Sequence, residues 1–118
     1  MYAIAYNSNM RLVLRQTAEF RDWLSAQDSL TEIRVRARLE RVENEFYLGN
    51  HKHFLGLIEL RWKVGLRLYL ALREFEVLVV LGGNKHAQEK DIKKAKKILE
   101  RELKTFASVQ SGSRSRKP

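Results

Sequence analysis

Residues 57–91, LIELRWKVGLRLYLALREFEVLVVLGGNKHAQEKD, predict three consecutive strands, a basic glycine-rich loop and the start of a charged helix. Apolar and polar residues alternate along the first two strands, as they do where one face of a sheet covers a core. A three-residue hairpin loop that ends on a left-handed Gly65 sets apolar residues opposite apolar residues. In this register Arg61 lies directly opposite Arg67. Like charges at opposed positions destabilise a sheet, so we expect an anion such as a phosphate between them.

The turn between the second and third strands predicts where the glycine-rich loop lies. With Arg73 and Glu74 as the turn, Leu81 comes to lie opposite Leu66. The loop 82–86 then reaches the end of the sheet that carries the paired arginines. Its glycines allow backbone N–H groups to point at an anion, and the following helix adds its positive N-terminal end. The loop is not a P-loop, because the GxxxxGK[ST] pattern does not occur in it.

An RNA phosphate bound at this patch would be open to in-line attack by the adjacent 2′-hydroxyl. That reaction needs a base for the hydroxyl, cations for the phosphorane and an acid for the leaving 5′-oxygen, but no metal ion or cofactor. We expect Glu59 or His86 to act as base or acid, and Arg61, Arg67 and Lys85 to stabilise the charge. The alternatives are a Glu59 that only balances the arginines and a His86 that is a solvated loop residue.

Further RNA contacts are expected around the patch. His51 and His53 share one face of a strand and could bind a metal ion, but no cysteine or carboxylate ligand is placed near them, so RNA contact is favoured. Trp23 and Trp62 lie on apolar faces and are predicted to belong to the core. The expected RNA-binding residues are Lys52, His51, His53, Lys63, Tyr69 and Lys90.

Composition and charge narrow the class of protein. The 118 residues suffice for one domain with a single core. A net charge of +9 indicates a polyanionic partner, and a basic protein without a nucleic-acid role is the alternative. The lack of cysteine excludes disulfides, thiol nucleophiles and cysteine-ligated zinc. No apolar run approaches the roughly 20 residues that span a bilayer, and the first residues lack a secretory pattern, so we expect a cytoplasmic protein with no membrane partner.

Two helices are predicted before the hairpins. Thr17 caps the first, which ends near Gln27. Ser29 and Glu32 form a capping box at the start of the second, which residues 48–50 stop. The second helix has one apolar side and one basic side. We expect its basic side to be solvated, with Arg34, Arg36, Arg38 and Arg41 on it, and a surface for an acidic partner or RNA is the alternative.

The two ends of the chain complete the expected fold. Residues 10–15 form a short strand, which residues 1–9 either extend or precede as a frayed segment. The last helix runs from about Ala87 to Phe106 and has a strongly basic surface, and the basic tail 108–118 is expected to be disordered. The fold class is therefore α+β: a small twisted antiparallel sheet of about four strands, two N-terminal helices packed on it and a C-terminal helix, in one domain over residues 1–107.

Several short motifs occur in a fixed order between residues 10 and 104, and in this order the chain resembles the RelE/ParE superfamily of toxins from type II toxin–antitoxin modules. The resemblance is to the HigB-like or phage Gp49-like branch, the addiction-module killer proteins. The motifs are Glu19-Phe20 with Trp23-Leu24, Arg38-Leu39-x-Arg41, Glu59-Leu60-Arg61, Gly65-x-Arg67-x-Tyr69, and Gly82-Gly83-x-Lys85-x-x-Gln88-x-x-Asp91-Ile92.

The resemblance implies a RelE-like fold and a cytoplasmic toxin that cleaves mRNA, usually in the ribosomal A site. It also implies a cognate antitoxin that neutralises the toxin, with a toxin–antitoxin hetero-oligomer as a consequence. The chain departs from the family pattern at Leu66, where a second aromatic is usual, and at His86, which replaces a small residue and is left to substitute for a missing aromatic. Two alternatives follow: a ParE-like toxin that binds DNA gyrase without cleaving RNA, and a catalytically inactive RNA-binding relative.

Overall fold

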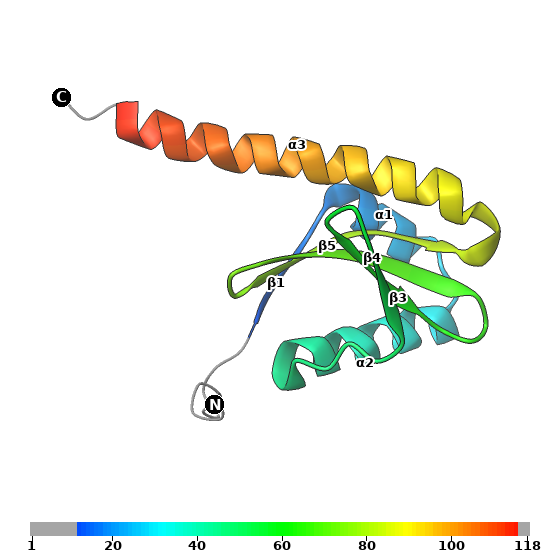
Figure 1. Ribbon diagram of the computed structural model, residues 1–118. Helices are drawn as coiled ribbons and strands as arrows, with labels where there is room; N and C mark the ends of the chain where they lie inside the picture. Colours follow the sequence, from blue (N-terminus) through cyan, green and yellow to red (C-terminus); the bar gives the residue numbers. More distant parts are fainter. Residues whose placement is uncertain (1–11, 116–118) are drawn as a thin grey trace.

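The computed structural model describes residues 12–115, and the side chains of residues 12–105. The expectation for residues 1–9 lies outside the described residues. The elements along the chain are β1 (Val13–Gln16), α1 (Ala18–Ser25), α2 (Ser29–Glu45), β2 (His51–Phe54), β3 (Leu57–Arg61), β4 (Leu66–Arg73), β5 (Glu76–Asn84), the 3₁₀ helix η2 (Lys85–Ala87) and α3 (Gln88–Ser115) (Figure 1).

The strands form one five-stranded sheet in the order β1-β5-β4-β3-β2. The predicted α+β class is confirmed, and β2 to β5 are antiparallel neighbours as expected. The sheet has one strand more than the four expected, and it is mixed, because β1 pairs with β5 in parallel. Alternation of apolar residues identifies a strand, but it does not fix the direction of a partner that comes some sixty residues later in the chain.

Helices cover both faces of this sheet, and Figure 1 shows α2 and α3 on opposite sides of it. Apolar residues of α1 and α2 pack on one face together with Ile58 and Leu60 of β3. Ala95, Ile98 and Leu99 of α3 pack on the other face. Within the described residues, no helix is both long enough and apolar enough to cross a membrane.

The hairpin between β3 and β4 has the predicted register. Arg61 lies opposite Arg67, and Glu59 lies opposite Tyr69. Gly65 closes the turn with φ +98°, in the left-handed region, and its N–H donates to the carbonyl of Trp62 at 3.0 Å. The three-residue loop was predictable because a two-residue loop would have set Trp62 against Arg67.

The predicted turn between β4 and β5 is wrong. Glu74 and Phe75 form it, so that Arg73 pairs with Glu76 and Leu66 lies opposite Asn84 instead of Leu81. Glu74 adopts φ +51° without being glycine or asparagine, so the sequence gives no sign of the turn. The true pairing differs from the predicted one by two residues next to the turn, and a two-residue shift leaves every side chain on the same face.

A β-bulge at Val80 then adds one further residue to β5. Tyr69 pairs with Leu81 and Leu70 with Val79, which leaves Val80 without an opposite residue. The hydroxyl of Thr17 donates to the carbonyl of Val80 at 2.7 Å, and Thr17 is also the predicted N-cap of α1. Beyond the bulge Arg67 lies opposite Gly83, so the expected proximity of Arg67 to residues 82–86 is confirmed.

Gly82, Gly83 and Asn84 belong to β5, and the predicted glycine-rich loop is wrong at these three positions. A Cβ atom on Gly82 would lie 2.3 Å from the ring of Trp23, and one on Gly83 would lie 2.1 Å from Oδ2 of Asp91. The lack of a side chain at Gly82 makes room for Trp23 of α1, and the lack of one at Gly83 makes room for Asp91 of α3. The two glycines do not form a loop around an anion.

Two helix boundaries also differ from the prediction. Asp28, not Ser29, caps α2, because its Oδ1 accepts from the N–H of Thr31 at 2.8 Å. That helix ends at Glu45, where Phe46 adopts a left-handed conformation, before the predicted stop at 48–50. At the other end of the chain, α3 continues to Ser115, so residues 108–115 are helical where a disordered tail was expected.

Candidate functional site

The alternation of β3 and β4 places four polar side chains on the α3 face of the sheet: Glu59, Arg61, Arg67 and Tyr69. Glu59 and Tyr69 are fully buried. The side chains of Arg61 and Arg67 are 27% and 13% exposed. The arginines therefore reach the surface above a buried carboxylate.

The carboxylate of Glu59 is the anion that compensates the two arginines. Its Oε1 accepts from Nε of Arg61 at 2.6 Å, and its Oε2 accepts from the hydroxyl of Tyr69 at 2.9 Å. Nε2 of Gln88 donates to both oxygens, at 3.2 Å and 2.9 Å. Nε of Arg67 lies 4.0 Å from Oε2. The expectation of an external anion between the arginines is thus corrected, since the chain supplies its own.

The surroundings of Glu59 favour its ionised form. Burial alone would raise the pKa of this carboxyl, but hydrogen bonds from Arg61, Gln88 and Tyr69 outweigh burial and lower the pKa. Burial, together with the hydrogen bond to Glu59, raises the pKa of Tyr69. A fully buried carboxylate with bound donors is not placed to take a proton from RNA, and the buried Tyr69 is not placed to touch RNA. Glu59 instead positions Arg61, and the hydroxyl of Tyr69 positions Glu59.

Arg67 is anchored to the hairpin through Nη1, whereas its Nε has no hydrogen bond within the described residues. Its Nη1 donates to the carbonyls of Leu66 and Trp62, at 3.0 Å and 3.3 Å. Its Nε is buried and makes no hydrogen bond to any described residue. Buried hydrogen-bond donors in proteins nearly always have a partner, so the unpaired Nε of Arg67 requires an explanation.

Lys85 and Lys63 lie at the same hairpin turn. The backbone N–H of Lys85 donates to the carbonyl of Gly65 at 2.8 Å, and the aliphatic part of the Lys85 side chain lies over Gly65. Lys63 occupies the turn itself, and both lysines are exposed. The four basic residues Arg61, Arg67, Lys85 and Lys63, here called the cationic cluster, therefore gather at one end of the sheet.

His86 follows the cationic cluster on the 3₁₀ helix η2 and is exposed. Its backbone N–H donates to Oδ1 of Asn84 at 2.9 Å, and Asn84 caps this short helix. His86 thus lies next to Lys85 in the chain, at the end of the sheet where the prediction places it. The asparagine cap is what fixes this segment in place of the expected glycine loop.

Residues 51–53 divide between the two faces of the sheet. Lys52 lies opposite Glu59, so it shares the face of the cationic cluster, and it is exposed. His51 and His53 lie opposite Leu60 and Ile58, on the other face, and the structure does not bring them to the cluster. Their rings are in edge-to-face contact at 5.2 Å, and the described residues contain no group of three or more side chains able to hold a metal ion.

The sequence analysis missed the parts played by two residues. Arg38 does not belong to a solvated face: it donates to the carbonyls of Leu48, Asn50 and Arg61, and its guanidinium lies 4.4 Å from the ring centre of Trp62. It thereby fixes the end of β3. Gln88 appeared only as part of a motif, since its position at a helix start gave no sign of a partner. Lys90, in the first turn of α3, is exposed as the prediction requires.

Comparison with known proteins assigns a family but no activity. No model of a known protein family matches the chain. A protein of Haemophilus influenzae, described as uncharacterized, is 33% identical over 102 residues, which cover 80% of this chain and 98% of the relative. The chain belongs to the family of this Haemophilus protein. Among solved structures, a chain of the toxin–antitoxin complex RelBE2 from Mycobacterium tuberculosis matches 64% of this chain and 99% of its own length, with a TM-score of 0.47 and 15% identity.

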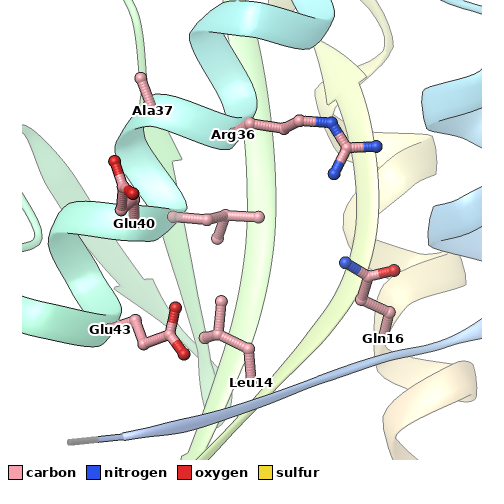
Figure 2. A pocket seen from close by; sticks show the side chains of 7 residues that line it. Leu14, Gln16, Arg36, Ala37, Glu40 and Glu43 are labelled. Atoms are coloured by element: carbon pink, nitrogen blue, oxygen red, sulfur yellow. The ribbon is translucent and has the colours of Figure 1, made fainter.

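A cavity of about 300 Å³ lies away from the cationic cluster, between α2 and β1. Figure 2 shows Leu14 and Gln16 of β1 facing the α2 side chains that form its other wall. Its lining combines apolar side chains with Arg36, Glu40 and Glu43, so it lacks the excess of positive charge that a phosphate requires. This cavity is therefore not suited to a phosphate, whereas the exposed Lys63 and Lys85 of the cationic cluster are suited to a polyanion.

Proposed function

We propose that this chain is the toxin of a type II toxin–antitoxin module and an endoribonuclease that acts on mRNA, with the cationic cluster as its phosphate site. The observation that carries the proposal is Arg67, a nearly buried guanidinium anchored to a rigid hairpin, with one donor unpaired, beside Lys85. A fixed cation of this kind stabilises charge that develops on a phosphate without having to reorganise. The order of the motifs along the chain, which resembles that of the RelE/ParE toxins, supports the same function.

In the proposed reaction, the 2′-oxygen attacks the neighbouring phosphorus and the bond to the 5′-oxygen breaks. A base removes the proton of the 2′-hydroxyl and an acid gives a proton to the 5′-oxygen, which leaves a 2′,3′-cyclic phosphate and a 5′-hydroxyl. Arg67, Arg61 and Lys85 stabilise the phosphorane, and His86 is the candidate for proton transfer. Lys52, Lys63 and Lys90 hold neighbouring phosphates. The scheme needs no metal ion.

The proposed partners are mRNA on the ribosome and a cognate antitoxin, which forms a hetero-oligomer with the toxin. The exposed lysines of the cationic cluster, Lys63 and Lys85, are suited to the backbone of an RNA strand. Ribosome dependence belongs to the proposal because of the resemblance of the motifs to the RelE/ParE superfamily.

A second candidate function is a catalytically inactive RNA-binding relative. The observation in its favour is the burial of Glu59, because it leaves His86 as the remaining candidate for proton transfer at the cationic cluster. One titratable group would have to supply both the base and the acid, whereas binding of RNA alone requires neither.

The proposal is tested with purified chain, translating ribosomes and a defined mRNA, with cleavage mapped by primer extension. Arg67→Ala should lower the cleavage rate by roughly 100-fold or more, as loss of a preorganised charge-stabilising donor does. Arg36→Ala is the matched control, since Arg36 is an exposed arginine on α2. Bound but uncleaved RNA would favour the inactive relative. Intact RNA together with double-strand DNA breaks in cells would favour the gyrase-binding alternative.

A further inference from the structure

Gln88 joins the start of α3 to the buried carboxylate under the cationic cluster. It is the first residue of α3, and its Nε2 donates to both oxygens of Glu59 across a separation of 29 positions in the chain. The other donors to Glu59 come from β3 and β4, the strands that carry the carboxylate and the arginines. Gln88 is thus the contact through which α3 reaches the site.

The hydrogen bonds of Glu59 fill its capacity as an acceptor. A carboxylate oxygen accepts about two hydrogen bonds. Oε2 accepts from the hydroxyl of Tyr69 and from Gln88, each at 2.9 Å. Oε1 accepts from Arg61 and, at a longer distance, from Gln88. No acceptor direction on Oε2 remains for Arg67.

The position of Arg67 agrees with that exclusion. Its Nε lies 4.0 Å from Oε2, beyond hydrogen-bond reach, although opposite charges attract each other strongly in a buried setting. The same Nε is buried and has no hydrogen-bond partner within residues 12–105. A shift of about 1 Å would turn this long ion pair into a hydrogen-bonded one, given the usual N···O distance of about 2.9 Å. The amide of Gln88 occupies the place on Oε2 that this pair would need.

We propose that Gln88 is a positioning residue: by occupying Oε2 of Glu59 it holds Arg67 off the carboxylate and keeps its guanidinium available to an RNA phosphate. The inference rests on the proposed function, because it assumes that Arg67 binds phosphate. A residue of α3 then controls the position of Arg67, which belongs to β4. The amide of Gln88 is neutral, so it keeps Arg67 apart from Glu59 without adding a charge that would compete for Arg67.

The test compares Gln88→Leu with Gln27→Leu in the full chain. Gln27 is the matched control, a part-buried glutamine whose Nε2 donates to the carbonyl of Trp23 at 3.0 Å, away from the cationic cluster. Gln88→Leu should lower mRNA cleavage and the affinity for inorganic phosphate by about 10-fold or more, the effect of losing roughly 1.4 kcal/mol of interaction. It should also shift the NMR signal of the Arg67 Nε–H group as this group pairs with Glu59. Gln27→Leu should leave cleavage, phosphate affinity and that signal unchanged.

A double-mutant cycle separates this role from a structural one. Arg67→Lys removes the Nε donor, so in its presence Gln88→Leu should have little further effect on cleavage. If the two effects multiply instead, Gln88 acts elsewhere and the inference is wrong. Full activity of Gln88→Leu, where Arg67→Lys is inactive, overturns the inference but leaves the proposed function standing. Full activity of Arg67→Lys overturns the inference as well, because the Nε donor of Arg67 is then not needed, whereas absence of cleavage by the wild-type chain overturns the proposed function.

Wild-type protein gives a further measurement, which does not depend on whether a variant folds. Titration with inorganic phosphate should shift the Nε–H signal of Arg67 and leave the side-chain amide signal of Gln88 nearly unchanged. A phosphate-induced shift of the Gln88 amide without one at Arg67 would show that Gln88 is itself the ligand, and the positioning role would be wrong.

Discussion

Arg61 and Arg67 lie directly opposite each other on β3 and β4, and Glu59 serves both. The carboxylate is bonded to Arg61 at 2.6 Å and lies 4.0 Å from Arg67. The repulsion that the register imposes is therefore compensated inside the fold, at the expense of a fully buried charge. The arginines are unequal as a result, since one is held by the carboxylate and the other is left with an unpaired donor.

Replacing Glu59 should reveal how much this compensation contributes. Glu59→Gln keeps the shape of the side chain but leaves two opposed arginines without a counter-charge, so we expect the free energy of unfolding to fall by about 3 kcal/mol. Urea denaturation followed by circular dichroism measures it. Glu40→Gln, at an exposed position on α2, is the control and should change stability by less than about 0.5 kcal/mol. Equal effects of the two changes would contradict the assignment.

The same carboxylate predicts an acid limb in the stability profile. The pKa of Glu59 in the folded chain lies below its ordinary value of 4.5, so its stabilising contribution is complete above that value and is lost as pH falls through the lower folded-state value. Urea unfolding between pH 6 and about pH 2.5 should show stability falling with pH in the wild type and a flatter profile in Glu59→Gln. A wild-type profile that is flat or rises toward low pH would exclude this contribution.

A second acidic group contributes to the same acid limb. Hydrogen bonds from Arg101 lower the pKa of Glu19 to about 2, and they join α3 to α1. Its side chain is 28% exposed and that of Arg101 48%, so solvent weakens this pair and we expect it to contribute less than about 1 kcal/mol. Glu19→Gln should therefore remove a small part of the loss of stability between pH 4.5 and pH 2.

The two neighbouring glycines of β5 should differ in their tolerance of a methyl group. Gly82→Ala brings a Cβ to 2.3 Å from the rigid ring of Trp23, and we expect a loss of about 2 to 3 kcal/mol from overpacking. Gly83→Ala meets the end of the Asp91 side chain, which can rotate away, so a loss of about 1 kcal/mol is expected. Thermal unfolding ranks the two variants. In the Gly82→Ala background, Trp23→Leu should recover stability, and a further loss would place the strain elsewhere.

Replacement of Arg38 should lower the free energy of unfolding far more than replacement of its neighbours on α2. Arg38→Ala removes donors to the carbonyls of Leu48, Asn50 and Arg61 and the contact with Trp62, and we expect a loss of about 2 to 3 kcal/mol. Arg36→Ala breaks an exposed pair with Glu32 and should cost less than about 0.5 kcal/mol. Chemical denaturation of both variants measures the difference, which a solvated Arg38 would not produce.

The hairpin with the paired arginines was predictable because several local constraints agree there. Alternation on both strands, Gly65 in the turn and the exclusion of apolar against charged positions all select one register. At the turn between β4 and β5, the local constraints do not agree in this way. Glu74 takes a conformation usually left to glycine, and the bulge at Val80 occurs within a run of apolar residues where no single residue stands out.

Other parts of the site depend on contacts that are remote in sequence. The pairing of Glu59 with Gln88 brings together a strand and a helix start, and periodicity within either segment carries no information about the other. Arg38 has the spacing of a surface residue on an amphipathic helix. Its burial results from the path of residues 48–50, which supply two of the carbonyls it binds. The cationic residues could be listed from sequence, but the buried partners that hold them could not.

The bond from Thr17 to Val80 has a consequence for the order in which the chain folds during synthesis. It joins residues 63 positions apart, and β1 likewise has no sheet partner until β5 has left the ribosome. The hydroxyl of Thr17 can accept a hydrogen bond from the N–H of Phe20 as soon as both residues are made. Helix α1 can therefore form early, while β1 stays unpaired until β5 is made. Closing so long a segment is slow, and β1 should join a sheet whose other four strands pair with near neighbours. The cationic cluster, whose last member Lys85 directly follows β5, therefore forms at about the time the sheet closes.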